Sequence, residues 1–283
     1  MSRYIFSIVS ALFIINITLI LAKDNRIHKN VIPKTFNLAE PPIETLVNIN
    51  NWSLWVKYDG TTGRDPFTGN SGGLYPRGTV GSVFADGFWW GGFINEFGTD
   101  FPLRMGGMSY ISGFAPGRIL PDGQPQDTLH PEVRIYRIRR GFQTMSNAEL
   151  AQDAAELLHK PLAQVTPQEI SAVRQQYKID WQSWPGNLGA PFYDHNQNGI
   201  WEPGIDEPGL AAADQVVWFT TNALDSATIK NFAGSPATGL EMQVTMWGYK
   251  TGGLFDNAIF RRYRLINKSP FLMDSMYVGQ WND

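Results

Sequence analysis

Short segments in which apolar and polar residues alternate constrain the fold of this chain more than any other feature. In residues 51–58, Trp52, Leu54 and Val56 recur at every second position, which places them on one face of a strand. Asp59-Gly60 then supplies the residues of a turn. Further strand-like segments lie at 82–93, 132–140, 215–221, 240–249, 258–267 and 273–281. Strands at such close spacing predict a mainly β fold, an antiparallel β-sandwich.

The composition agrees with this fold class. The chain has 283 residues, of which 43% are hydrophobic and only 17% charged, so it can bury a sizeable core. It contains 10 Trp, 10 Tyr and 17 Phe together with 28 Gly and 18 Pro. Aromatic residues favour strands, and glycine and proline favour turns, so a helical bundle is disfavoured.

One region departs from the β pattern. Ser146-Asn147-Ala148-Glu149 and Thr166-Pro167-Gln168-Glu169 each match a capping box, in which a hydroxyl and a glutamate three residues later satisfy the first N–H groups of a helix. Apolar residues at helical spacing follow both boxes. The sequence therefore predicts a short helical hairpin, at about residues 146–182, inserted into the β framework.

Two of the expected strand segments carry more specific predictions. In 82–93, Asp86-Gly87 predicts the turn of a hairpin or a bulged strand pair, and the adjacent Trp89 and Trp90 should point to opposite faces. In 132–140, we expect the arginines to lie on a solvated face or at a sheet edge. These arginines are Arg134, Arg137, Arg139 and Arg140.

The N-terminus is typical of a secretory signal peptide. Met1-Ser2-Arg3 is positively charged, residues 4–21 are mostly apolar, and Ala22 precedes the polar residues that follow. This predicts a signal peptide at 1–22, with a retained membrane anchor as the alternative. Residues 23–45 are expected to form an extended lead-in, and 46–283 a β-rich extracellular domain. The protein is accordingly predicted to be secreted or to lie at the cell surface.

Charge and cysteine content exclude several classes of function. The net charge is −3, whereas binding to nucleic acid phosphates needs a basic surface, so no nucleic acid partner is expected. The chain has no cysteine, which excludes disulfides, zinc–thiolate sites and cysteine nucleophiles. Membrane contact is expected only through an uncleaved N-terminal segment. The candidate partners are a glycan or another surface protein.

The loop at 194–207 is the strongest candidate site in the sequence. Oxygen-bearing side chains alternate and are followed by a glycine, as in loops that wrap a calcium ion. The predicted ligands of a Ca²⁺ ion are Asp194, Asn196, Asn198, the carbonyl of Ile200, Glu202 and Asp206. In an EF-hand the last carboxylate would stand at position 205, so Asp206 comes one residue late, and Pro191 and Pro203 disfavour flanking helices. The alternative is an Asn198-Gly199 turn whose acidic residues are merely solvated.

No pattern in the sequence selects catalytic residues. Acidic residues near the expected strands are Asp86, Glu96, Asp100, Asp214, Asp225 and Glu241, but no spacing singles out a pair for glycoside hydrolysis. The four histidines, at 28, 130, 159 and 195, do not have a metal-binding spacing. Gly69-Asn70-Ser71-Gly72-Gly73 is similar to the nucleophile segment of chymotrypsin-like proteases, but only His28 precedes it, so a glycine turn is the better interpretation.

Several longer motifs occur together in one order. They are YDGTTGRDPFTGNSGGLYPRGT, FADGFWWGG, RIYRIRRGF, DWQSWPGNLGAPFYDHNQNGIWEPGIDEPG, QVVWFTTNALD, GLEMQVTMWGY and FRRYRLINKS. In this order the chain resembles the N-terminal region of large, uncharacterised secreted or surface proteins of Bacteroidetes-type bacteria. Those proteins commonly carry a type IX secretion sorting domain, which implies an extracellular location. This chain has no such domain and ends at Asp283 directly after an expected strand, so we expect that a C-terminal region is missing.

Three functions agree with these features. The first is a calcium-stabilised β-sandwich module at the cell surface, with a structural or adhesive role and no catalysis. The second is a carbohydrate-binding module, suggested by the abundance of tryptophan. The third is a hydrolase of the glycosidase type. We expect the first.

Overall fold

The computed structural model describes residues 40–95, 102–110 and 114–283, with the side chains of 231–233 left aside. These residues all belong to one compact unit, Pro33–Asp283. The signal peptide at 1–22 and most of the lead-in lie outside the described residues and stay predictions. The last two residues of the expected lead-in, Glu44 and Thr45, begin the first strand.

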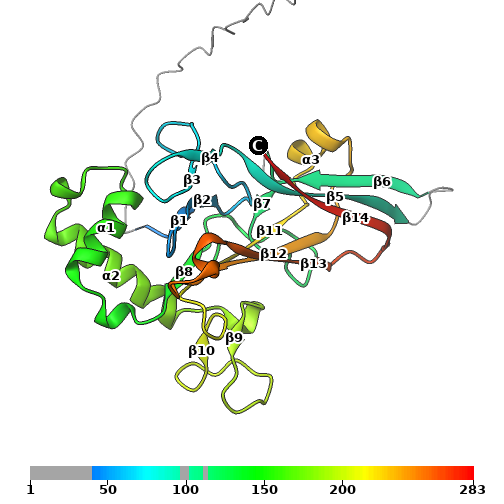
Figure 1. Ribbon diagram of the computed structural model, residues 1–283. Helices are drawn as coiled ribbons and strands as arrows, with labels where there is room; N and C mark the ends of the chain where they lie inside the picture. The colour runs from blue at the N-terminus through cyan, green and yellow to red at the C-terminus, as the bar shows by residue number, and fades with distance from the viewer. Residues whose placement is uncertain (1–39, 96–101, 111–113) are drawn as a thin grey trace, which may run out of the picture. The chain divides into compact units, whose positions relative to one another are not determined.

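The predicted antiparallel β-sandwich with an inserted helical hairpin is confirmed (Figure 1). One layer contains two sheets, ordered β1-β2-β3-β4 and β14-β5-β6 and joined by a bridge between Thr62 and Asp86. Their strands are β1 (Glu44–Val47), β2 (Ser53–Lys57), β3 (Gly73–Leu74), β4 (Gly81–Val83), β5 (Asp86–Asn95), β6 (Leu103–Met108) and β14 (Leu272–Asn282).

The second layer is a sheet ordered β13-β12-β11-β7, in which β8 also pairs with β11. Its strands are β7 (Ala115–Pro116), β8 (Tyr136–Arg139), β11 (Gln215–Asn222), β12 (Leu240–Gly248) and β13 (Phe260–Asn267). As predicted, β12 and β13 form an antiparallel pair across the turn at 251–257, with Trp247 opposite Phe260. Every residue of β11 is buried, as expected for a central strand.

The main hydrophobic core lies between the two layers. Leu54 and Val56 of β2 enter it and Trp52 packs against it, which confirms the predicted face of this strand. Met242, Val244 and Met246 enter it from β12. Because successive strand residues point to opposite faces, Trp55 lies instead in a second cluster on the outer side of β2.

The helical insert covers that outer side. Helix α1 (Asn147–Leu157) and helix α2 (Pro167–Gln182) pack there around Leu46 and Trp55. Both predicted capping boxes are present, with the Glu149 N–H donating to Ser146 Oγ (3.2 Å) and the Glu169 N–H donating to Thr166 Oγ1 (3.3 Å). The remaining helices are α3 (Ser226–Ala233), η1 (Phe142–Thr144), η2 (Leu162–Gln164), η3 (Gly186–Leu188) and η4 (Leu254–Asn257).

The prediction of a turn at Asp86-Gly87 is wrong, because both residues belong to the continuous strand β5. Gly87 is required by packing: a Cβ atom there would lie 2.5 Å from the backbone nitrogen of Tyr110. The other prediction for this segment is confirmed. Trp89 is 41% exposed and Trp90 is 3% exposed, so the two rings occupy opposite faces.

The expectation that the arginines in 132–140 lie on a solvated face is wrong for two of the four, although β8 pairs only with β11 among the described strands and so lies at a sheet edge. Arg134 and Arg137 are only 8% and 5% exposed. The helical insert covers them and supplies carboxylates, with Asp180 of α2 pairing with Arg134 and Asp153 of α1 pairing with Arg137. Burial is tolerated because each charge has a hydrogen-bonded partner of opposite sign.

Candidate functional site: an oxygen-rich loop and the adjoining cleft

The candidate calcium loop is predicted at 194–207; residues 194–206 connect the two strands of a small hairpin, and Glu207 already belongs to the second strand. Strands β9 (Phe192–Tyr193) and β10 (Glu207–Pro208) pair in an antiparallel manner, with Glu207 opposite Tyr193. The loop therefore starts and ends at the same place.

The first half of the loop is a series of tight turns around Asp194. Its carboxylate accepts hydrogen bonds from the N–H groups of Gly199 (2.7 Å) and Asn198 (3.3 Å). Asn196 Oδ1 accepts from the Asn198 N–H (3.2 Å), and Asn198 Oδ1 accepts from the Ile200 N–H (2.7 Å). Gly199 has a φ of 76°, a left-handed conformation that suits glycine, so the residue stands where a sharp turn is needed.

The second half of the loop folds back onto the first. Glu202 Oε2 accepts hydrogen bonds from the Nδ2 atoms of Asn196 (2.7 Å) and Asn198 (2.6 Å). Asp206 is 6% exposed and accepts from the N–H groups of His195 (3.2 Å) and Glu202 (2.8 Å). The carboxylate at 206, one residue later than in an EF-hand, thus reaches the start of the loop.

The structure brings the predicted side-chain ligands into one hydrogen-bonded loop. Ile200 can contribute only its carbonyl, and its side chain is 64% exposed. Asp194, Glu202 and Asp206 pair with no lysine or arginine in the part of the chain that is described. Within the described ranges, no three histidine, aspartate or glutamate side chains lie close enough together to hold a metal ion. The predicted ligand set instead mixes carboxylates with amides and a carbonyl, the oxygen donors that Ca²⁺ accepts.

An aromatic cluster anchors this loop to the body of the protein. Trp201 packs with Tyr136, Trp184 and Trp218 on the outer side of β8 and β11. The ring of Trp201 lies 5.3 Å from that of Phe192, centre to centre. A Cβ atom on Gly186 would lie 2.5 Å from Trp201 Cγ, so only glycine allows this approach. The conformation of the loop is therefore coupled to the packing of the sandwich.

A cleft of about 640 Å³ adjoins the loop. Trp201 and Pro203 of the loop line it, together with Gln182 and Ser183 at the end of α2. Arg134 and Tyr136 also line it. This cleft was not predicted from the sequence. A signal for it was present, because tryptophans lie next to or near prolines outside the expected strands, at Trp184-Pro185 and Trp201-Glu202-Pro203.

The charged groups of the cleft neutralise one another. Arg134 Nη2 lies 2.9 Å from Asp180 Oδ1 and also donates to Ser183 Oγ (2.9 Å). The Arg134 guanidinium lies 4.3 Å from the centre of the Tyr136 ring, a cation–π contact. Burial raises the pKa of Asp180 to about 6, while Arg134 and the Arg137 N–H act against this rise. Burial also raises the pKa of the Tyr136 hydroxyl, which therefore stays protonated at neutral pH.

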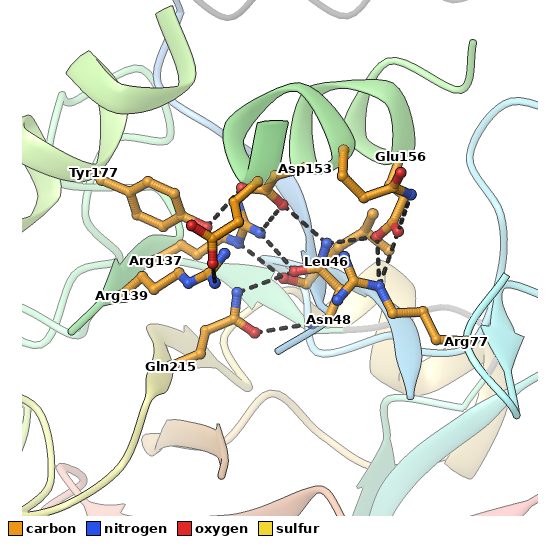
Figure 2. Close-up of polar contacts among 11 residues, drawn as sticks. Leu46, Asn48, Arg77, Arg137, Arg139, Asp153, Glu156, Tyr177 and Gln215 are labelled. Carbon is orange, nitrogen blue, oxygen red and sulfur yellow. Dashed lines mark hydrogen bonds and ion pairs between the residues drawn. The ribbon is translucent and has the colours of Figure 1, made fainter. Parts of the chain in front are cut away.

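A buried polar network joins the helical insert to both layers (Figure 2). Arg137 of β8 donates to Asp153 of α1 (2.5 Å), to Asn48 Oδ1 (2.7 Å) and to the Leu46 carbonyl (3.0 Å). The Tyr177 hydroxyl of α2 donates to the other oxygen of Asp153 (2.7 Å). Burial alone would raise the pKa of Asp153, but Arg137 and these hydrogen bonds hold it below its ordinary value. Because every charge is paired and fixed, the network is suited to holding elements together.

The acidic residues considered for glycoside hydrolysis have structural contacts. Asp86 is 1% exposed and forms an ion pair with Arg261. Glu241, also 1% exposed, accepts from the Ile119 N–H (2.9 Å). Asp225 caps α3, and Asp214 accepts from the Lys250 N–H (2.7 Å). Glu96 and Asp100 lie outside the described residues.

Comparisons with known proteins identify no relative. No family model, curated protein or solved structure matches the chain. Among the helices of the described residues, none is long and apolar enough to cross a membrane.

Proposed function

We propose that this protein is a secreted or cell-surface β-sandwich module, stabilised by calcium, with a structural or adhesive role. The observation that carries the proposal is that hydrogen bonds gather five of the predicted ligand side chains into one folded loop at 194–206. Glu202 accepts from both Asn196 and Asn198, and Asp206 reaches back to the N–H of His195. An ion among these groups would replace hydrogen bonds within the loop by bonds from oxygen to calcium.

Binding would rearrange the hydrogen bonds of the loop. Rotation of the Asn196 and Asn198 amides would turn their oxygens from the N–H groups of Asn198 and Ile200 toward the ion, and Glu202 would exchange two N–H donors for one cation. Closure of the loop would bring Asp194 and Asp206 into the same coordination shell. Bringing unpaired carboxylates together is unfavourable without a cation, so the closed loop depends on the metal.

The position of the loop supports a stabilising role. The loop closes the β9–β10 hairpin and is attached to the aromatic cluster through Trp201. Ions held by many protein oxygens leave little room for a substrate, and a chain without disulfides benefits from another cross-link outside the cell. The signal peptide predicted at 1–22 and the resemblance to secreted bacterial proteins support the location.

Thermal unfolding with and without calcium tests the proposal. With two amides among the ligands, we expect a dissociation constant of roughly 10⁻⁴–10⁻³ M. At 10 mM calcium, binding to the folded state would add about 1.4–2.7 kcal/mol and raise the Tm by roughly 3–8 °C. Magnesium, which is smaller and holds its water more tightly, should give a much smaller shift.

Asp194→Ala should abolish the calcium-dependent rise in Tm. The control is Asp122→Ala, because the Asp122 carboxylate, like that of Asp194, accepts a backbone N–H (from Gln124, 3.1 Å), but in an exposed turn outside the loop. The control should keep the full calcium response. A wild-type Tm that does not change with calcium, or an Asp194→Ala variant that still responds, would contradict the proposal.

A further inference from the structure

We propose that the cleft beside the calcium loop binds a neutral saccharide. The cleft, of about 640 Å³, lies within the range of about 300–1,000 Å³ that is usual for small-molecule sites. It lies where the end of α2, the segment before β8 and the loop at 194–206 meet. The inference rests on the proposed function only in that the calcium loop supplies one wall.

The charge balance of the cleft favours an uncharged ligand. Arg134 is paired with Asp180 (2.9 Å), and Glu132 is paired with Arg118 (2.9 Å). Neither the Arg134 guanidinium nor the Glu132 carboxylate is therefore available to bind an ionic group of a ligand. A phosphorylated or acidic ligand would need a positive charge that the lining does not offer.

Two primary amides on the lining are available for hydrogen bonds. The side chains of Gln182 and Asn187 are exposed and have no side-chain partner among residues 40–95, 102–110 and 114–283. An amide both donates and accepts, as does a sugar hydroxyl, so a single amide can bind adjacent hydroxyl groups. This pattern of donors and acceptors suits a polyol.

The third feature is one accessible aromatic ring. Trp201 lines the cleft, is partly exposed and is held in place by Gly186 and Phe192. A fixed indole face can pack against the C–H groups of a pyranose ring. Gln182 and Asn187 would then bind the hydroxyl groups at the edge of the same sugar.

A proline-rich peptide is the competing occupant, because such peptides dock on grooves lined by several aromatic rings. The other two rings here are not free to serve in this way. Trp184 and Tyr136 are 2% and 3% exposed, and the Trp184 Nε1–H donates to the Pro191 carbonyl (2.7 Å). A single exposed ring with two free amides fits a saccharide better.

Binding measurements on the full chain test this inference. The probes are neutral oligosaccharides derived from glucan, mannan, galactan and xylan, an acidic oligosaccharide derived from polygalacturonate, and a proline-rich peptide. Titration calorimetry in the presence of calcium should show binding of at least one neutral oligosaccharide. Gln182→Ala and Asn187→Ala should each weaken that binding about fivefold to tenfold, as expected for one lost hydrogen bond to an exposed ligand.

Gln168→Ala is the matched control, because Gln168 is exposed near the other end of the same helix and away from the cleft. It should bind the saccharide as the wild type does. All three substitutions replace exposed side chains, so folding should be preserved, and an unchanged Tm would verify this. Three outcomes would overturn the inference. They are no binding of any neutral oligosaccharide at millimolar concentration, binding by the Gln182 and Asn187 variants as tight as by the wild type, and preferential binding of the acidic or proline-rich probe.

The calcium experiment and the saccharide experiment test the two proposals independently, so either proposal can fail without the other. A saccharide that binds through Gln182 and Asn187 to a protein whose Tm does not respond to calcium would refute the proposed function and keep the cleft as a saccharide site. A calcium-dependent Tm without saccharide binding would keep the proposed function and refute the saccharide site.

Discussion

At the scale of single residues, the structure contains buried ion pairs that could be predicted only in part from the sequence. Arg137 alternates with apolar neighbours in 132–140 as an exposed residue of an edge strand would. Its partner Asp153 is 16 residues away and lies on the apolar side of α1, between Leu150 and Ala154. An acid on an apolar helix stripe signals a buried partner, but it does not say which cation that partner is. The loop ligands could be predicted because their spacing is local.

Asp153→Asn should destabilise the protein strongly. The amide keeps the shape of the carboxylate but leaves the Arg137 charge buried without a counterion, which costs about 3–5 kcal/mol. Urea denaturation should show this loss in the free energy of unfolding. Asp127→Asn, at an exposed turn where the Asp127 carboxylate accepts from the Leu129 N–H, should change it by less than about 0.5 kcal/mol. Equal effects of the two substitutions would contradict a stabilising role for the buried pair.

Asp180 should make stability depend on pH in an unusual direction. Burial raises its pKa in the folded protein to about 6, above its ordinary value of 3.8, so the folded state binds the proton more tightly than the unfolded state. The contribution of Asp180 to stability is therefore largest below about pH 4 and is lost as the pH rises to about 6. We expect the free energy of unfolding of the wild type, relative to Asp180→Asn, to fall over this interval. A difference between the two proteins that stays constant from pH 4 to 7 would be inconsistent with the raised pKa.

At the scale of helices and strands, features set by residues close together in sequence were predicted correctly, and features set by distant residues were not. The helical insert was predicted because its capping boxes are complete within four residues. The start of β5 was not, because Asp-Gly is a turn signal from local preferences alone. Gly87 is present for a contact with the backbone of Tyr110, which belongs to a different part of the chain. A glycine required by long-range packing looks the same in sequence as a glycine required by a turn.

Thr166→Ala should destabilise α2 and, with it, the insert. The hydroxyl of Thr166 accepts from the Glu169 N–H, and its loss typically costs about 1 kcal/mol. Ser171→Ala is the matched control, because it removes an exposed hydroxyl from the interior of the same helix, where alanine is the better helix former. Chemical denaturation should show a loss for Thr166→Ala and no loss, or a slight gain, for Ser171→Ala. A similar loss for both would contradict the capping interpretation.

At the scale of the compact unit, the sequence could predict the class of the fold but not the assignment of strands to layers. The pairing of β5 with β14 joins Trp89 to Gly279 across nearly the whole described chain. Similarly, β7 and β8 both pair with β11, although neither is its neighbour in sequence. Alternating residues show that a strand has one buried face, but they do not show which strand lies beside it. The choice of partner for each strand depends on contacts between residues far apart in the sequence.

The same long-range contacts predict how the compact unit unfolds. The main core takes residues from both layers, and the Arg137–Asp153 network attaches α1 and α2 to that core. We therefore expect the helical ellipticity at about 222 nm and the tryptophan fluorescence to be lost in a single coincident transition, as for one cooperative domain. Calcium should shift both signals together, because the ion stabilises the folded state as a whole.

Asp153→Asn should separate these two signals. Without a counterion for Arg137, the insert loses its main polar attachment, whereas the contacts between the two layers are unchanged. Helical ellipticity should then fall at a lower temperature than the tryptophan fluorescence, because nine of the ten tryptophans lie outside residues 146–182. A variant in which both signals still coincide, at any Tm, would show that the apolar contacts of Leu46 and Trp55 with the helices are sufficient to couple the insert to the sandwich.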